Sequence, residues 1–65
     1  MRIYDEHHLE DAIRRAINDN AYLLVEYKKG KREIIHVLVK ETVKNTGGRG
    51  DPSTIRRILE RKLAF

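Results

Sequence analysis

Residues 21–44 read AYLLVEYKKGKREIIHVLVKETVK, and this stretch decides which fold class the sequence predicts. Its two halves, residues 21–28 and 31–44, are rich in Val, Ile, Leu and Tyr, the residue types that strands favour. Apolar residues alternate in each half, as on one face of a strand; they are Leu23, Val25, Tyr27, Ile35, Val37 and Val39. With Lys29-Gly30 between them, the halves predict a β-hairpin, closed by either a two-residue turn or a three-residue loop with a bulge.

Helices are predicted on both sides of this hairpin, over residues 6–19 and 52–63. Asp5 is placed to cap the first helix, and Asp51 with Pro52 opens the second in the favoured N-cap and N1 positions. Apolar residues recur in both segments at the 3.6-residue spacing of a buried helix face. They are Leu9, Ala12, Ile13, Ala16, Ile17, Ile55, Ile58, Leu59 and Leu63.

A short strand over residues 2–4 completes the predicted order, which is β-α-β-β-α within a single domain of residues 1–65. A right-handed crossover then places the first strand beside the third. The expected fold is therefore α/β of the two-layer α+β kind, a truncated ferredoxin-like arrangement. Its three-stranded sheet has the order 1-3-2, with two helices on one face. The other face would carry Leu24, Ile34, His36 and Leu38, as either a partner surface or a mere strand preference.

Composition excludes several classes of function. The 65 residues carry a formal charge of +4 and contain no cysteine, so neither disulfides nor a thiolate metal site is available. His7 and His8 point in different directions on a helix and His36 lies on a predicted strand, so no histidine metal site is expected. No transmembrane span or signal-peptide pattern is present. A single serine and no room for a catalytic pair argue against an enzyme.

The glycine-rich segment Gly47-Gly48-Arg49-Gly50-Asp51, followed by Pro52, is the most distinctive local motif. It falls in the predicted loop of residues 45–51, between the last strand and the C-terminal helix. Arg49-Gly50-Asp51 is the tripeptide that integrins bind. The same Asp51 has an ordinary structural use as a helix N-cap, so a partner-binding role and a capping role are both open at this position.

On this motif and the regular, well-capped pattern around it, the chain resembles de novo designed miniproteins that present an Arg-Gly-Asp loop to an integrin. The resemblance favours the fibronectin receptor, integrin alpha-5/beta-1, over the alpha-v types, although Pro52 departs from the Arg-Gly-Asp-Ser-Pro loop of fibronectin. It implies a monomer that is produced in the cytoplasm, acts extracellularly as a cell-adhesion ligand, inserts into no membrane and holds no cofactor of its own.

The same resemblance implies roles for individual residues. Arg49 would pair with a carboxylate of the α-subunit, and Asp51 would coordinate the Mg²⁺ or Mn²⁺ ion of the β-subunit adhesion site, a role that suits a hard oxygen ligand. Gly50 would let the backbone lie close to the receptor. The predicted partner-binding set is therefore Gly48, Arg49, Gly50, Asp51 and Pro52.

A small basic nucleic-acid-binding protein is the alternative. Its contacts would come from the hairpin tip and from a basic helix face; these comprise Lys28, Lys29, Lys31, Arg32, Arg56, Arg57, Arg61 and Lys62. Ten acidic residues mixed among fourteen basic ones, and the lack of aromatic residues interleaved with the tip, argue against this alternative.

Overall fold

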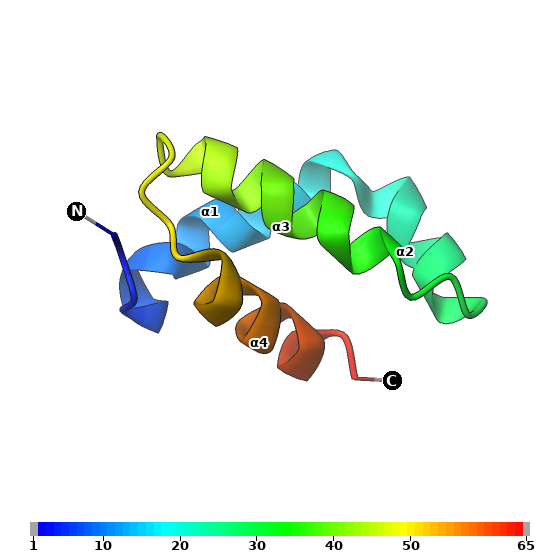
Figure 1. Cartoon of the computed structure of the whole chain (residues 1–65). Coiled ribbons are helices and arrows are strands. Elements are labelled where there is room, and N and C mark those ends of the chain that lie inside the picture. Colours follow the sequence, from blue (N-terminus) through cyan, green and yellow to red (C-terminus); the bar gives the residue numbers. More distant parts are fainter. Residues whose placement is uncertain (1, 65) are drawn as a thin grey trace.

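The computed structural model describes residues 2–64, and over that range the chain forms four α-helices (Figure 1). They are α1 (Glu6–Asp19), α2 (Ala21–Lys28), α3 (Ile34–Asn45) and α4 (Pro52–Lys62). Within this range the only β-type pairing is one isolated parallel bridge between Ile3 and Gly50. The predicted α/β ferredoxin-like fold, with its strand at residues 2–4, its hairpin and its 1-3-2 sheet, is therefore wrong.

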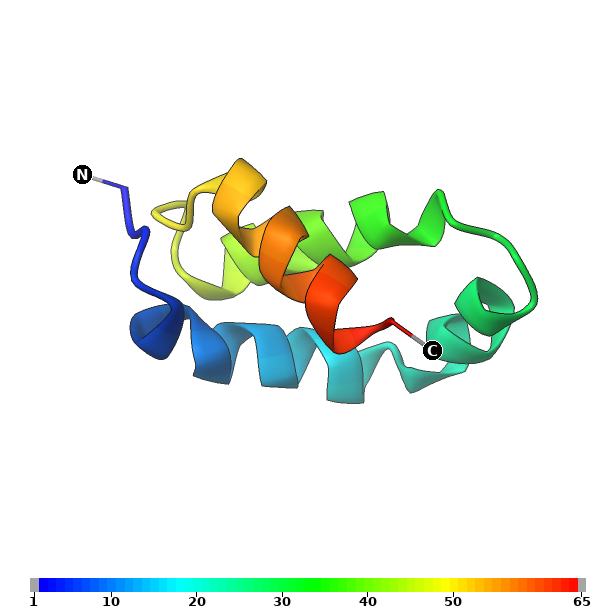
Figure 2. The ribbon, with the colours of Figure 1, turned by 90° about the horizontal axis from the view of Figure 1, so that it is seen from below.

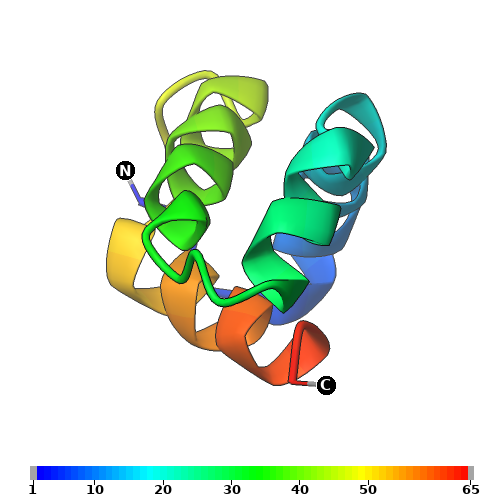
Figure 3. The same ribbon diagram turned by 90° about the vertical axis from the view of Figure 1, so that its right-hand side faces the viewer.

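The helices are arranged around α3. Seen from two directions, α3 runs back along α1 in the opposite sense while α4 packs across both (Figures 1 and 2). Viewed along the bundle, α3 lies on one side, α1 and α2 lie on the other, and α4 closes the bottom (Figure 3). None of the helices in the described residues is long and apolar enough to cross a membrane.

The two predicted helices, now α1 and α4, are confirmed together with their caps. The Asp5 carboxylate accepts a hydrogen bond of 3.0 Å from the backbone N–H of His7, and Asp51 caps α4 with Pro52 in the first turn. Burial of the two apolar stripes drives this part of the fold. Ile17 is half-buried. The other residues of the two stripes are all buried: Leu9, Ala12, Ile13, Ala16, Ile55, Ile58, Leu59 and Leu63.

The predicted hairpin turn at Lys29-Gly30 is instead the end of α2. Gly30 has φ +113°, and its N–H donates to the carbonyl of Tyr27 at 3.0 Å, while the N–H of Lys31 donates to Glu26 at 3.1 Å. These two bonds are the pair of a Schellman motif, which satisfies the last carbonyls of a helix when a glycine adopts a left-handed conformation. Gly30 therefore stops one helix and lets the chain turn into the next.

The α3 segment is buried at helical rather than strand spacing. Ile34, Ile35, Leu38 and Thr42 are all under 9% exposed, at positions i, i+1, i+4 and i+8, which share one side of a helix. Val37, predicted to face inward beside Ile35, is 42% exposed.

The predicted outer sheet face does not exist as a surface. Ile34 and Leu38 belong to the core, Leu24 is half-buried against it, and of the four predicted residues His36 alone is exposed. The prediction put buried residues of α3 on the exposed side because it used the strand period of two, whereas the segment follows the helical period of 3.6.

The core lies where α1, α3 and α4 meet. Its centre consists of side chains with no exposed surface or almost none: Leu9, Ile13, Leu38, Ile55 and Leu59. Thr42 is also fully buried, and its hydroxyl donates to the carbonyl of Leu38 at 2.8 Å, so its polar group is satisfied within α3. Asn45 donates from its side chain to the carbonyl of Ala12 at 3.1 Å and ties the end of α3 to α1.

Neighbouring residues of α3 provide a direct test of this packing. Leu38→Ala should lower the free energy of unfolding by about 2–5 kcal/mol, because it leaves a cavity among three helices. Val37→Ala, one position along on the exposed side, should change it by less than about 0.5 kcal/mol. Urea unfolding followed by circular dichroism measures both. Equal costs for the two variants would contradict the helical register of α3.

Candidate functional site

The glycines that open the Arg-Gly-Asp segment end α3. Gly47 and Gly48 have φ +69° and +85°. The N–H of Gly47 donates to Lys44 at 3.0 Å, and the N–H of Gly48 donates to Val43 at 2.9 Å. This is a second Schellman motif. The conformational freedom of these glycines is used to terminate a helix, not to extend a loop toward a receptor.

Gly50 lies in the interior of the protein. The backbone around it pairs with Ile3, whose N–H donates to the carbonyl of Arg49 at 2.6 Å and whose carbonyl accepts from the N–H of Asp51 at 3.0 Å. The N–H of Gly50 itself donates to the hydroxyl of Thr46 at 2.7 Å. A Cβ at this position would lie 2.7 Å from Ile55 Cδ1 and 3.0 Å from Thr46 Oγ1. A side chain here would have to displace these neighbouring side chains, so close packing favours glycine.

The Asp51 carboxylate is engaged within the chain. One oxygen accepts from the backbone N–H of Thr54 at 2.9 Å and from its hydroxyl at 2.8 Å. The other accepts from the guanidinium of Arg2 at 3.1 Å, and only 14% of the Asp51 side chain is exposed. The Thr54 hydrogen bonds, followed by Arg2, hold the pKa of Asp51 below its ordinary value. The capping role of Asp51 is confirmed.

These contacts leave little of the segment free for an outside partner. Gly48, Arg49 and Pro52 are exposed, whereas Gly50 is buried and Asp51 is half-buried. Coordination of a partner's metal by Asp51 would require its bonds to Thr54 and Arg2 to break, and the helix start would lose its cap. Across residues 2–64, no three His, Cys, Asp or Glu side chains come together as a metal site would require.

Many of the basic side chains proposed to contact nucleic acid are paired with acidic ones. Arg61 is hydrogen-bonded to Glu6 and Lys62 lies 3.9 Å from Glu10, so both ion pairs join α4 to α1. Beside the predicted hairpin tip, Lys31 lies 3.5 Å from Glu26. The basic face of α4 is thus partly neutralised by its neighbours, which weakens its field toward an anion.

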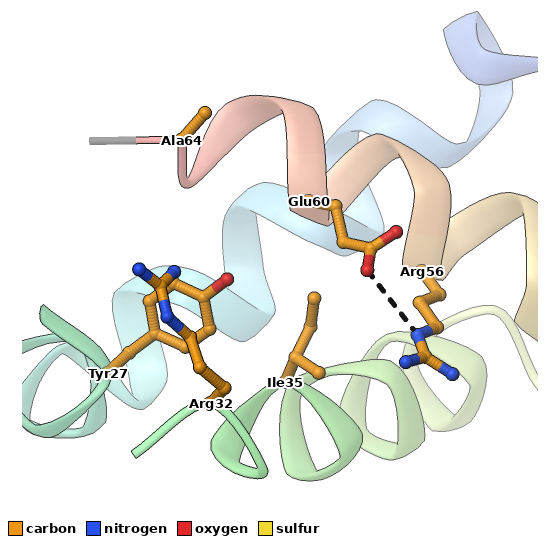
Figure 4. A pocket seen from close by; sticks show the side chains of 6 residues that line it. All are labelled: Tyr27, Arg32, Ile35, Arg56, Glu60 and Ala64. Atoms are coloured by element: carbon orange, nitrogen blue, oxygen red, sulfur yellow. Dashed lines mark ion pairs between the residues drawn. The ribbon is translucent and has the colours of Figure 1, made fainter. Parts of the chain in front are cut away.

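A groove opens beside α4, between that helix and the junction of α2 with α3. It encloses about 480 Å³ and is shown from close by in Figure 4. We call it the Arg32–Arg56 groove, and its lining residues are Tyr27, Arg32, Ile35, Arg56, Glu60 and Ala64. It combines an aromatic ring, an apolar floor and two guanidinium groups, the ingredients of a binding site for a small anionic group.

Comparison with known proteins assigns the family. Residues 1–63 match the family model described as the GatB domain. The chain therefore belongs to the GatB domain family. No solved structure matches it.

Its relatives include GatB subunits of aspartyl/glutamyl-tRNA(Asn/Gln) amidotransferases. The Methanopyrus kandleri subunit is 32% identical over 63 residues, which are 97% of this chain and 14% of the relative. A Clostridium acetobutylicum subunit of the same kind is also 32% identical, over 97% of this chain and 13% of its own length. The Roseiflexus castenholzii subunit is 34% identical over 56 residues, 86% of this chain and 12% of the relative. The chain thus spans about one seventh of the length of such relatives or slightly less.

These findings correct the predicted function. A family with amidotransferase relatives replaces the designed integrin-binding miniprotein, and the match covers residues 1–63 instead of one short motif. The integrin partner, its Mg²⁺ or Mn²⁺ ion and the extracellular role are wrong for the same reason. The nucleic-acid-binding alternative, built on a Lys28–Arg32 hairpin tip, is also unsupported, because that tip is the helix stop at Gly30.

Sequence reasoning overlooked the residues of the Arg32–Arg56 groove as a site. Arg32 and Arg56 were considered only as parts of separate basic clusters, and Tyr27 was placed on a strand. One sequence signal was available for the fold beneath the groove: a glycine just after an apolar segment that ends in lysines is a common helix C-terminus. It would have identified Gly30 and Gly47 as helix stops.

The packing of Gly50 can be tested with a double-mutant cycle. Gly50→Ala should destabilise the protein by about 1–3 kcal/mol, because the added methyl group overlaps Ile55 Cδ1. Ile55→Val removes that atom, so Gly50→Ala should cost less in the Ile55→Val background. Thermal unfolding of the four proteins gives the coupling energy. A cost that is the same in both backgrounds would show that Ile55 is not the obstacle.

The cap at Asp51 predicts a pH dependence. Since the folded-state pKa of Asp51 is lowered, its ionised form stabilises the fold above the ordinary pKa of 3.8, and this contribution is lost as pH falls through the lower folded value. Asn caps nearly as well as Asp. Asp51→Asn should therefore be less stable than the parent near neutral pH but approach it at about pH 2, while Asp51→Ala should lose about 5 °C in Tm at about pH 2, where only the cap is missing, and more near neutral pH.

Asp11→Asn is the matched control for this titration. Its carboxylate is 88% exposed, and the nearest cation is Arg14 at 3.7 Å. Exposed pairs of this kind contribute little, so its Tm should follow that of the parent across the titration. If the Tm of Asp51→Asn also followed that of the parent at every pH, the charge of Asp51 would make no difference to its hydrogen bonds with Thr54 and Arg2.

Proposed function

We propose that this chain serves as a non-catalytic helical domain of an amidotransferase that acts on aspartyl- or glutamyl-tRNA. The observation that carries the proposal is the match to the GatB subunits of such enzymes, which extends over 97% of the chain. Those relatives are named as subunits of aspartyl/glutamyl-tRNA amidotransferases. We propose further that residues 1–65 act as one domain in that setting.

The side chains support a non-catalytic role. Amide transfer requires a nucleophile or a positioned acid–base pair near the reacting carbonyl. The chain has no cysteine, and its one serine, Ser53, is exposed in the first turn of α4. The carboxylates that are held by hydrogen bonds, Asp5, Glu6 and Asp51, have lowered pKa values, caused mainly by hydrogen bonds from His7, Arg61 and Thr54 respectively. A lowered pKa makes a carboxylate a weaker base.

A role in binding a partner remains a prediction for the segment Gly48, Arg49, Gly50, Asp51 and Pro52. The exposure of Arg49 and Pro52 supports it. Within this proposal the partner is another part of the amidotransferase. Gly50 and Asp51 act there through the local structure that they stabilise.

A chimaera tests the proposed function. The segment of the Methanopyrus kandleri GatB subunit that matches residues 1–63 is replaced by this chain in the full amidotransferase. A second version carries a Gly-Ser linker of equal length. Aminoacyl-tRNA, ammonium and ATP, which activates the carboxylate, are supplied, and transamidation is measured. We expect the chimaera to retain most of the parent activity, to within about fivefold, and the linker version to lose considerably more.

The isolated 65-residue chain is the control for catalysis and should produce no amidated product under the same conditions. Turnover by the isolated chain would contradict its non-catalytic assignment. A chimaera no better than the linker version would contradict the assignment to this enzyme, because a domain of the same fold and function should restore what the linker removes.

A further inference from the structure

The Arg32 side chain in the Arg32–Arg56 groove is held in place by an aromatic ring. Its guanidinium carbon lies 4.6 Å from the centre of the Tyr27 ring, and Tyr27 is itself only 5% exposed. A guanidinium that lies over a ring is attracted to the ring face and keeps its N–H edges available. Of the acidic groups that the structure describes, none lies within ion-pair distance of Arg32.

Arg56 faces the same groove from α4 and is only loosely engaged. Its Nε lies 3.7 Å from a Glu60 oxygen, the dashed line in Figure 4, which is longer than a hydrogen bond. Ile35 lies between the two arginines in that view. The groove therefore presents two guanidinium groups on either side of an apolar floor.

The charges that line the groove define the ligand. Arg32 and Arg56 carry two positive charges and Glu60 carries one negative charge, so the net charge is +1 and matches a single carboxylate. The planar guanidinium of Arg32 suits a planar carboxylate, which it can bind through two parallel hydrogen bonds. The small exposed surface of Ile35, which is 4% exposed, and that of Ala64 offer apolar contact to an aliphatic side chain beside that carboxylate.

We infer that the Arg32–Arg56 groove binds an acidic peptide segment of a partner protein, with a Glu or Asp carboxylate on Arg32 and an adjacent apolar side chain on Ile35. Arg56 adds a second, longer-range attraction. Inorganic phosphate is a poorer match, because near neutral pH it carries more than one negative charge, which the groove does not neutralise, and Glu60 at the rim repels it. The inference does not rest on the proposed amidotransferase role, since it follows from the lining residues alone.

The test uses the whole ¹⁵N-labelled chain and two capped dipeptides, acetyl-Leu-Glu-amide and acetyl-Leu-Gln-amide. These differ only in the carboxylate. Amide chemical shifts in the α2–α3 junction and in α4 are followed during titration at low salt. We expect the Glu peptide to shift these signals and to bind about tenfold more tightly than the Gln peptide, because only a carboxylate accepts charge-assisted bonds.

Variants locate the site. Arg32→Gln should weaken binding of the Glu peptide about tenfold, and Arg56→Gln severalfold. Arg15→Gln and Arg57→Gln, at exposed positions outside the groove, change the net charge equally and should alter affinity by less than about twofold. If a groove variant fails to fold, the comparison of the two peptides on the parent protein still shows whether the chain recognises a carboxylate.

Three outcomes would overturn the inference. Equal affinity for the Glu and Gln peptides would show that the groove does not recognise the carboxylate. Equal losses of affinity in Arg15→Gln and Arg32→Gln would show that only the net charge of the protein matters. Tighter binding of inorganic phosphate than of the Glu peptide would show that the groove recognises a phosphate group instead.

Discussion

The absence of a side chain at Gly50 is the constraint on which the rest of the structure depends. Ile55 of α4, Thr46 at the end of α3 and Leu9 of α1 all approach the position that a Cβ would occupy, to within 2.7–3.3 Å. The backbone on either side pairs with Ile3. Three helices and the N-terminal segment therefore converge on one residue, and the direction in which α4 leaves this point determines how it closes the core.

Helix stops are the second requirement of this fold. A chain of this length has few apolar residues to bury, so each of its short helices must end where the next can pack back. Gly30 and the pair Gly47-Gly48 provide those ends, and each end is closed by its own pair of Schellman hydrogen bonds. Asn20, where α1 ends and α2 begins, uses its side-chain amide instead, which donates to the carbonyl of Ala16 at 2.9 Å. Side-chain and backbone donors thus satisfy the orphan carbonyls.

The start of α4 and the part that follows it serve different purposes. Its N-terminal end is occupied by structural contacts, because the Asp51 carboxylate binds Thr54 and Arg2 and has little exposure left. Further along the helix, Arg56 and Glu60 line the Arg32–Arg56 groove, where the Arg32 guanidinium lies over the Tyr27 ring and has no acidic partner in the described chain. The most distinctive sequence motif is therefore used to build the fold, and the chemistry that a partner can reach lies further along the helix.

The sequence by itself determined α1, α4 and their caps. Each of these helices has one buried stripe and a charged opposite side, so the 3.6-residue period is visible in residues such as Leu9, Ile13, Ile55 and Leu59. Only the tertiary structure decided α2 and α3. Because α3 packs against α1, α2 and α4, apolar residues occupy several of its sides, and the run from Ile34 to Val39 reads as a strand by composition alone. Likewise Arg32 and Arg56 are 24 positions apart in the sequence, and only the packing of α4 beside the α2–α3 junction brings them to one groove.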